Sequence, residues 1–196
     1  MAEALLGFGG NVGDVRTTLN EAVALFADGK DVTLRFASSQ YLTPPWGVLE
    51  QPRFTNMAIV VDTTLRSASS QYLTPPWGVL EQPRFTNMAI AVDTTLSARA
   101  LLERAMNIES AFDRDRYRER RWGPRPVDID LLSYDNLVVN EPGLILPHPR
   151  LFERAFVLVP LNEIVPGRVI AGRNIKEALA KLDDRGIERL PPLRGA

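Results

Sequence analysis

Two aspartates separated by a single residue give this sequence its strongest chemical signal. They lie in the segment Val127–Leu131, which reads Val-Asp-Ile-Asp-Leu. If this segment is a strand, alternation places Asp128 and Asp130 on one face, about 7 Å apart. Two carboxylates so close repel each other unless cations or water lie between them, and such hard oxygen ligands suit Mg²⁺ together with substrate phosphates. Taken alone, the pattern is equally typical of an amphipathic strand with a solvated acidic face.

An arginine-rich segment directly precedes these aspartates. Residues 113–125 read DRDRYRERRWGPR, and guanidinium groups bind phosphate oxygens bidentately and stay charged. The acidic residues between the arginines leave open a second interpretation, a solvated helix end of mixed charge. However, Gly123 and Pro124 interrupt any helix and place Arg125 at the mouth of the acidic strand. The combination predicts a polyphosphate site, where two metal ions can hold the attacking and leaving oxygens of a displacement at phosphorus.

Four further side chains are candidates for the same site. His148 is the sole histidine and lies between two prolines, so neither a zinc site nor a hydrolase triad is supported. It either donates to a phosphate or packs within a loop. Arg154 and Phe156 either complete a pocket for an anion and a ring or belong to a helix surface and a core. Trp122 either stacks on a flat ring or anchors the arginine-rich segment.

The glycine-rich segment Gly7–Gly13 invites a dinucleotide-binding interpretation, which fails. A GxGxxG motif that starts at Gly7 needs glycine at position 12, where Val12 stands, and no Walker lysine follows. The segment predicts instead a tight strand-to-helix turn, whose backbone could approach a flat ligand closely.

A near-identical repeat occupies the middle of the chain. Ala37–Leu65 and Ala68–Leu96 differ at one position, where Val60 stands against Ala91, and the offset is 68 − 37 = 31 residues. Solenoid repeats diverge in sequence and need about three copies, so these two copies indicate duplication of one supersecondary unit. Removing one unit leaves 196 − 31 = 165 residues, which suits a single domain. We therefore predict one domain over residues 1–196, with tandem segments at 37–65 and 68–96.

The elements that must position these residues alternate between strand and helix patterns. With one copy set aside, their order is β-α-β-β-α-β with additions, which predicts an α+β split sandwich with an antiparallel sheet. Asp14 suits a helix N-cap. The pattern places strands at 4–8, at the segment ending at 41 or 72, at 54–61 or 85–92 and at 127–134. It places helices with apolar stripes at 15–26 and 101–112, and a last helix at 175–182.

Composition narrows the function classes. The formal net charge is −1, so nothing global favours nucleic acid or an anionic membrane as a partner. The sequence has no cysteine, which excludes disulfides, thiolate metal sites and a cysteine nucleophile. No apolar run approaches about 20 residues, and the start lacks a basic segment before an apolar one, so no membrane span or signal peptide is expected. We expect a cytoplasmic protein.

From about Ala4 to Pro166, the motifs of the chain resemble, in order, the 6-hydroxymethyl-7,8-dihydropterin pyrophosphokinases of folate biosynthesis. The resemblance rests on Gly-Gly-Asn after the first strand, TPPWG, EQPRFTN, RRWGPR-x-VDIDLL and LPHPRLFERAFVLVPL. It implies a ferredoxin-like α+β fold. It also implies transfer of pyrophosphate from MgATP to the pterin hydroxymethyl oxygen, with release of AMP. Two Mg²⁺ ions and ATP as co-substrate follow from the same resemblance.

The resemblance assigns a role to each matching residue. Asp128 and Asp130 would bind the metal ions, and Arg125 would contact the transferring phosphates with Arg114 or Arg116. The loop between Glu109 and Trp122 is one residue longer than expected, so these last two remain alternatives. ATP would be held by Glu109, Trp122, Arg125, Leu131, His148 and Arg154. The pterin would lie among Thr74, Pro75, Pro76, Phe85 and Asn87, or their twins Thr43, Pro44, Pro45, Phe54 and Asn56, together with Phe156.

Only one set of pterin residues can lie beside Asp128 within a monomer, so three arrangements are open. The first copy could be native, the second could be native, or the opening strand of the first could pair with the closing strand of the second. We favour the second, in which the first copy adds an extra β-hairpin after Gly29. An unpaired hairpin edge would invite dimerisation of an otherwise monomeric protein. The alternative function is a catalytically impaired pterin- and ATP-binding or assembly protein of the same fold, disabled by the duplication.

Overall fold

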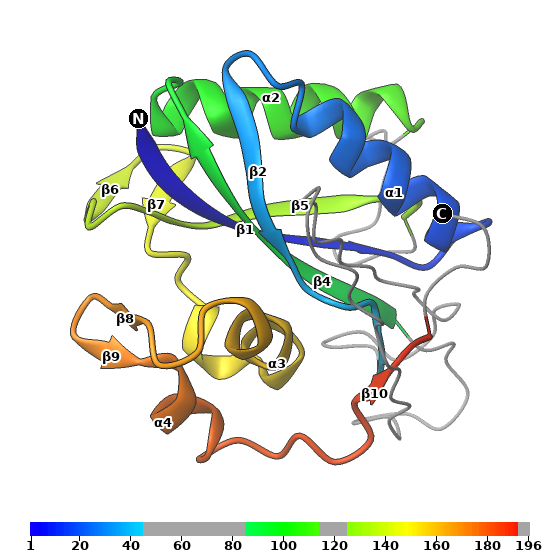
Figure 1. The fold of residues 1–196 in the computed structure, drawn as a ribbon, viewed down its shortest axis with the longest axis vertical. Coiled ribbons are helices and arrows are strands. Elements are labelled where there is room, and N and C mark those ends of the chain that lie inside the picture. Colours follow the sequence, from blue (N-terminus) through cyan, green and yellow to red (C-terminus); the bar gives the residue numbers. More distant parts are fainter. Residues whose placement is uncertain (45–84, 114–124, 192–196) are drawn as a thin grey trace.

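The computed structural model describes residues 1–44, 85–113 and 125–191. Among them, six strands form one antiparallel sheet, in the order β10-β3-β4-β1-β5 with β2 also paired to β4 (Figure 1). The sheet strands are β1 (Ala2–Gly10), β2 (Val32–Ala37), β3 (Tyr41–Thr43), β4 (Phe85–Thr94), β5 (Asp128–Tyr134) and β10 (Glu188–Arg189). The remaining elements are α1 (Val15–Phe26), α2 (Ala98–Ala111), β6 (Val139–Glu141), β7 (Leu144–Leu146), the short 3₁₀ helix η1 (Leu151–Glu153), α3 (Ala155–Ile164), β8 (Val169–Ile170), β9 (Arg173–Asn174) and α4 (Ile175–Leu179).

The element order confirms the prediction of a mixed fold of helices around an antiparallel sheet. β1, α1, β2 with β3, β4, α2 and β5 follow one another as the β-α-β-β-α-β pattern requires. The additions are the two short hairpins β6–β7 and β8–β9, the helices η1, α3 and α4, and the strand β10. Among the described residues, no helix has the length and apolar character needed to cross a membrane.

Alternate residues of β1 enter two different cores, one on each face of the sheet. Leu6 and Phe8 pack with α1 and α2, whereas Leu5 packs with α3 and α4. The sheet is therefore covered on both faces, as Figure 1 shows. Any side chain on a central strand can be assigned to the α1–α2 face or to the α3 face by its position in this alternation.

Helix α1 forms as its sequence pattern predicts. The Asp14 side chain accepts a hydrogen bond from the Thr17 backbone N–H, which satisfies one of the unpaired donors at the helix start. The predicted apolar stripe of Val15, Leu19, Val23 and Phe26 is buried against the sheet.

The prediction of a last helix over 175–182 is wrong at its C-terminal end, because α4 ends at Leu179. The backbone N–H groups of Lys181 and Leu182 donate to the carbonyls of Ala178 and Leu179, three residues back, so the chain tightens out of the α-helical pattern.

The arrangement favoured for the two copies is also wrong. Thr43 of the first copy pairs with Phe85 of the second, and Tyr41 pairs with Asn87. β4 has β1 along one side and β2 with β3 along the other, so no side of β4 remains for the second copy's own opening strand. The structure thus has the third arrangement, in which β2 leads directly into the first copy and the second copy leads directly into α2. The expected extra hairpin falls within residues 45–84, outside the described residues.

Candidate functional site

The two aspartates lie on β5 as the alternation predicts. Val127, Ile129 and Leu131 are buried in the core beneath α1 and α2. Asp128 and Asp130 point the other way, on the same face as Leu132, which packs in the core with α3. Their side chains are 31% and 36% exposed, so both carboxylates can be reached from solvent. The acidic pair therefore belongs to the α3 face of the sheet.

Three cationic or titratable side chains surround this acidic pair. Arg125 Nη1 lies 3.1 Å from Asp128 Oδ1, and Arg154 Nη1 lies 3.4 Å from Asp130 Oδ2. His148 Nε2 lies 3.9 Å from Asp130 Oδ1. The sequence placed these residues up to 29 positions apart, and the fold brings all five side chains to one end of β5. Carboxylates beside guanidinium groups form a site that can accept both metal ions and phosphate oxygens.

His148 is held in a defined orientation. Its backbone N–H donates to the Leu132 carbonyl at 2.9 Å, and its ring Nδ1 accepts from the Arg150 backbone N–H at 3.2 Å. A nitrogen that accepts carries no proton, so the neutral ring carries its proton on Nε2, which faces Asp130. Burial lowers the pKa of His148, against the opposing effect of the Asp130 carboxylate. His148 therefore presents an N–H donor to the site at neutral pH.

The backbone of Arg125 is fixed by Asn11, which the sequence analysis missed. Asn11 is 5% exposed, its N–H donates to the Arg125 carbonyl at 2.9 Å, and its Oδ1 accepts from the Arg125 N–H at 2.7 Å. A Cβ at Gly10 would lie 2.1 Å from the Pro126 carbonyl oxygen, so only glycine allows this approach. The glycine turn thus holds the segment that leads into β5. A Gly-Gly-Asn sequence between a strand and a helix was the available signal.

The Glu109 side chain is buried and binds the protein backbone. It is fully buried near the C-terminal end of α2, and its Oε1 accepts from the Ile129 backbone N–H at 2.8 Å. Because Ile129 lies between the two aspartates, this bond fixes the part of β5 that carries them. The predicted contact of Glu109 with ATP remains a prediction. Leu131, predicted beside ATP as well, has its side chain in the opposite core.

A second wall of the site lies on β3 and β4 and consists of Thr43, Phe85 and Asn87. Asn87 Nδ2 donates to Thr43 Oγ1, which joins a residue of the first copy to one of the second. Asn87 lies on the α3 face, because Ala89 and Ala91 on the same strand pack in the core with α3. We refer to these three residues as the β3–β4 wall and to Asp128 and Asp130 as the acidic pair.

β1 separates this wall from the acidic pair by glycines alone. Gly9 pairs with Asn87 on one side and with Asp128 on the other, and Gly7 pairs with Ala89 and Asp130 in the same way. Two strand spacings put Asn87 and Asp128 about 10 Å apart. Since glycine has no side chain, the floor between the β3–β4 wall and the acidic pair is flat.

The other predicted pterin residues divide into two groups. Pro44 is partly buried directly after β3, and Phe156 is partly buried on α3, with its ring centroid 5.6 Å from Arg154 Cζ. Two sets of predicted site residues lie outside the described residues: Arg114, Arg116 and Trp122 within 114–124, and Pro45, Phe54, Asn56, Thr74, Pro75 and Pro76 within 45–84.

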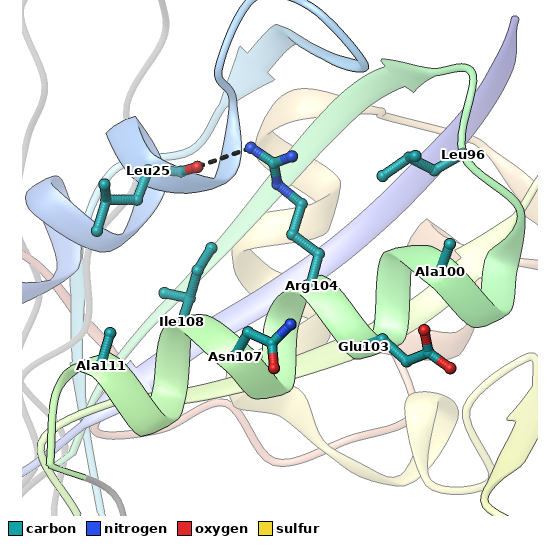
Figure 2. Close-up of a pocket in the computed structure, with 8 residues that line it drawn as sticks. All are labelled: Leu25, Leu96, Ala100, Glu103, Arg104, Asn107, Ile108 and Ala111. Carbon is teal, nitrogen blue, oxygen red and sulfur yellow. Dashed lines mark hydrogen bonds between the residues drawn. The ribbon is translucent and has the colours of Figure 1, made fainter.

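A hollow of about 510 Å³ lies elsewhere, between α1 and α2 (Figure 2). Arg104 crosses it: Nη2 donates to the Leu25 carbonyl at 2.9 Å and lies 3.0 Å from Asp28 Oδ2. A cation that binds the last carbonyls of a helix stabilises that helix end. This hollow is on the α1–α2 side of the sheet, opposite the acidic pair, and the cation that crosses it, Arg104, is explained by the capping of α1.

An acidic pair flanked by two arginines and an Nε2–H donor, on a sheet with a flat glycine floor, defines a site suited to metal-bound phosphates beside a ring. The chain belongs to the 7,8-dihydro-6-hydroxymethylpterin-pyrophosphokinase (HPPK) family, whose pattern matches residues 5–68 and again residues 63–166. The first match contains the first copy of the repeat and the second match contains the second.

Curated relatives agree along nearly the whole chain. The chain is 42% identical over 190 residues to the 2-amino-4-hydroxy-6-hydroxymethyldihydropteridine pyrophosphokinase of Methylorubrum extorquens, covering 97% of this chain and 99% of the relative. It is 40% identical to the enzyme of that name from Pseudomonas aeruginosa, covering 95% of each. The resemblance in the sequence motifs is thereby confirmed.

Solved structures support the fold alone. The wild-type HPPK-DHPS of Plasmodium falciparum matches with a TM-score of 0.59 at 13% identity, covering 92% of this chain and 44% of that chain. This chain therefore spans less than half of that larger chain.

Proposed function

We propose that this chain transfers the pyrophosphoryl group of MgATP to the hydroxymethyl oxygen of 6-hydroxymethyl-7,8-dihydropterin, with release of AMP, as a step of folate biosynthesis. Membership of the HPPK family and the names of the curated relatives support this reaction. The observation that carries it is the pairing of Gly9 with both Asn87 and Asp128, because it sets a ring-recognition wall beside a phosphate site.

The acidic pair fits Mg²⁺. Among the described residues, no group of three or more acidic or histidine side chains forms a cage made of protein alone. Mg²⁺ commonly binds through one or two carboxylates and completes its coordination with waters and substrate phosphates. Asp128 and Asp130 would hold two such ions, which when bound neutralise the charge that develops on the phosphate oxygens.

The surrounding donors would orient the triphosphate. Arg125 and Arg154 present guanidinium groups within 3.4 Å of the carboxylates, so each can rotate to a phosphate oxygen that arrives beside the acidic pair. His148 donates from Nε2. Glu109 and Asn11 hold the backbone at Ile129 and Arg125, which keeps these donors in position before substrate binds. Arg114 or Arg116 and Trp122 would complete the ATP site.

The pterin would lie on the glycine floor with Asn87 and Thr43 at its polar edge. An amide and a hydroxyl can satisfy a ring edge that carries both donors and acceptors. Phe85 and Phe156 would enclose the ring faces. In this proposal the functional set combines Thr43 and Pro44 of the first copy with Phe85 and Asn87 of the second.

We further propose a ferredoxin-like split sandwich as the common unit of the fold, supported by the order β1-α1-β2/β3-β4-α2-β5. The chain acts as a cytoplasmic monomer on small molecules alone, with dimerisation through the duplicated segment as its alternative state. The absence of cysteine suits a reducing compartment, and a net charge of −1 does not favour a nucleic-acid or membrane partner.

The alternative of a catalytically impaired protein is not favoured, because relatives named as pyrophosphokinases align with almost all of this chain. The test is AMP release by the pure, folded protein with ATP, Mg²⁺ and hydroxymethyldihydropterin. We expect AMP that depends on both Mg²⁺ and the pterin. AMP no higher than in the control without pterin would refute the proposed function.

A further inference from the structure

A buried polar segment leads into the β3–β4 wall. Ser38, Ser39, Gln40 and Tyr41 are each at most 4% exposed, although all four carry polar side chains. Buried polar groups persist in a fold when they find partners, so the partners of this segment show what fixes it.

Glu163, on the last turn of α3, binds this segment with both carboxylate oxygens. Oε2 accepts from the Ser39 backbone N–H at 2.7 Å and from the Tyr41 hydroxyl at 2.8 Å. Oε1 accepts from Ser39 Oγ at 2.7 Å and from Arg189 Nη2 at 2.6 Å. Because the acceptor is a carboxylate, these hydrogen bonds are charge-assisted. The Glu163 side chain is 26% exposed, so the bonds lie at the protein surface.

The C-terminal strand and α1 bind the same segment. The Leu190 N–H donates to the Gln40 carbonyl at 2.8 Å, and Arg16 Nε donates to Gln40 Oε1 at 2.6 Å. Arg16 also donates to the Pro191 carbonyl. Residues 38–41 are therefore fixed by α3, β10 and α1, in addition to their pairing with β4.

We call the bonds between Glu163 and residues 38–41 the anchor. The anchor lies next to the β3–β4 wall along β3, and next to Phe156 along α3. Tyr41 pairs with Asn87, and Thr43, two residues further on, accepts from the Asn87 amide. On α3, Phe156 precedes Glu163 by seven residues, which is close to two helical turns, so both lie on one side of the helix. Movement of Glu163 would therefore change the position of Thr43 relative to Phe156.

We propose that Glu163 is a positioning residue for the pterin: it binds Ser39 and Tyr41 and thereby sets Thr43 and Asn87 relative to Phe156. This role rests on the proposed function. β3 has only three residues, and a strand this short is held by few ladder hydrogen bonds, so its position depends on the anchor at residues 38–41.

The experiment measures kcat and the KM of each substrate for Tyr41→Phe and Glu163→Gln. Tyr41→Phe removes one hydroxyl donor and keeps the ring, so the KM for the pterin should rise about fivefold, as expected for one lost hydrogen bond. Glu163→Gln replaces an acceptor of four donors by an amide and should raise it further. The KM for ATP should stay unchanged, because the acidic pair lies on β5.

Tyr134→Phe is the matched control. The Tyr134 hydroxyl donates to the Leu96 carbonyl at 2.6 Å, at the far end of β5, so this variant loses a comparable bond away from the β3–β4 wall. It should lower the melting temperature without changing either KM. If folded Tyr41→Phe and Glu163→Gln keep the wild-type pterin KM, or if both KM values rise together, the positioning role is wrong. Wild-type protein without AMP release would instead contradict the proposed function.

Discussion

The acidic pair and its cationic neighbours lie outside the repeated segments, so the sequence holds a single copy of each. The β3–β4 wall, in contrast, combines residues from both copies of the repeat. Asp128, Asp130 and Arg125 lie within six positions of one another and are fixed by Asn11 and Glu109. Thr43 and Asn87 are 44 positions apart and meet across β3 and β4.

This difference shows how a sheet can accommodate two copies of one segment and still form a single β3–β4 wall. β2 continues into β3 through residues 38–40 of the first copy, and β4 continues into α2 through residues 95–97 of the chain. Each half of the wall thus keeps the short connection that fixes it. The copies are identical in the residues of the wall, so a combined wall has the same chemistry as one built from a single copy.

The largest effect is expected at the acidic pair. Under the proposed function, Asp128→Ala or Asp130→Ala should lower kcat by about a thousandfold, because each would remove a ligand for the ions proposed to neutralise the phosphates. The measurement is AMP release at saturating substrates, with circular dichroism to confirm the fold. Asp184→Ala, at an exposed aspartate, is the control and should be neutral. More than a tenth of wild-type turnover in either variant would contradict the metal assignment.

Gly10→Ala should be the most damaging change to the turn that holds Arg125. The new Cβ would meet the Pro126 carbonyl, and relief of that clash should cost about 2 kcal/mol of unfolding free energy. At Gly7 an added Cβ would make ordinary contacts of 3.6 Å, so Gly7→Ala should keep the stability of the wild type. Denaturant unfolding compares the two, and equal midpoints would show that the close approach is unimportant.

Substitutions in the β3–β4 wall should affect one substrate. Asn87→Ala removes the amide that donates to Thr43 in the β3–β4 wall, and it should raise the KM for the pterin about tenfold while leaving that for ATP unchanged. Asn56→Ala makes the same change in the other copy and should have no effect. If Asn56→Ala raised the pterin KM as much as Asn87→Ala, the assignment of the wall to the second copy's strand would fail.

Removal of residues 44–74 should have a small effect. Because the copies match, this 31-residue deletion gives the same sequence as removal of residues 37–67 and joins Thr43 directly to Pro75. Unfolding free energy should change by about 1 kcal/mol or less, since the number of residues between two paired strands weakly affects closure entropy. Both KM values should be retained. Loss of the folded state would mean that the duplicated residues contribute to the core.

The smallest effect is expected at Asp28, which belongs neither to the β3–β4 wall nor to the acidic pair. Backbone N–H groups, that of Lys30 above all, together with Arg104 lower the pKa of Asp28 to about 2. Its ionised form stabilises the fold above the ordinary value of 3.8, and this stabilisation is lost as the pH falls through about 2. The melting temperature of Asp28→Asn should lie below that of the wild type at pH 5 and converge with it towards pH 2. If the difference in melting temperature between Asp28→Asn and the wild type stayed constant with pH, the effect would not come from the charge of Asp28.

The features that could be predicted from the sequence are those that depend on local periodicity. The alternation around Asp128 and Asp130 and the stripe of α1 depend on neighbouring residues, and both are confirmed. The anchor at Glu163 depends on residues 122 and 124 positions away, and that of Arg125 on one 114 positions away, so no local pattern contains them. The choice between copies was also beyond the sequence, because identical residues have identical propensities. It was decided by which strands the chain connections bring to β4.

The most direct test of the account is ³¹P NMR of the complete reaction with wild-type protein, ATP, Mg²⁺ and hydroxymethyldihydropterin. Transfer by the acidic pair and its arginines predicts equal amounts of AMP and of a pterin ester that carries two coupled phosphorus atoms. Asp128→Ala should form neither product in detectable amount within the same reaction time. ADP with a pterin monophosphate, or AMP with free pyrophosphate, would contradict pyrophosphoryl transfer at this site.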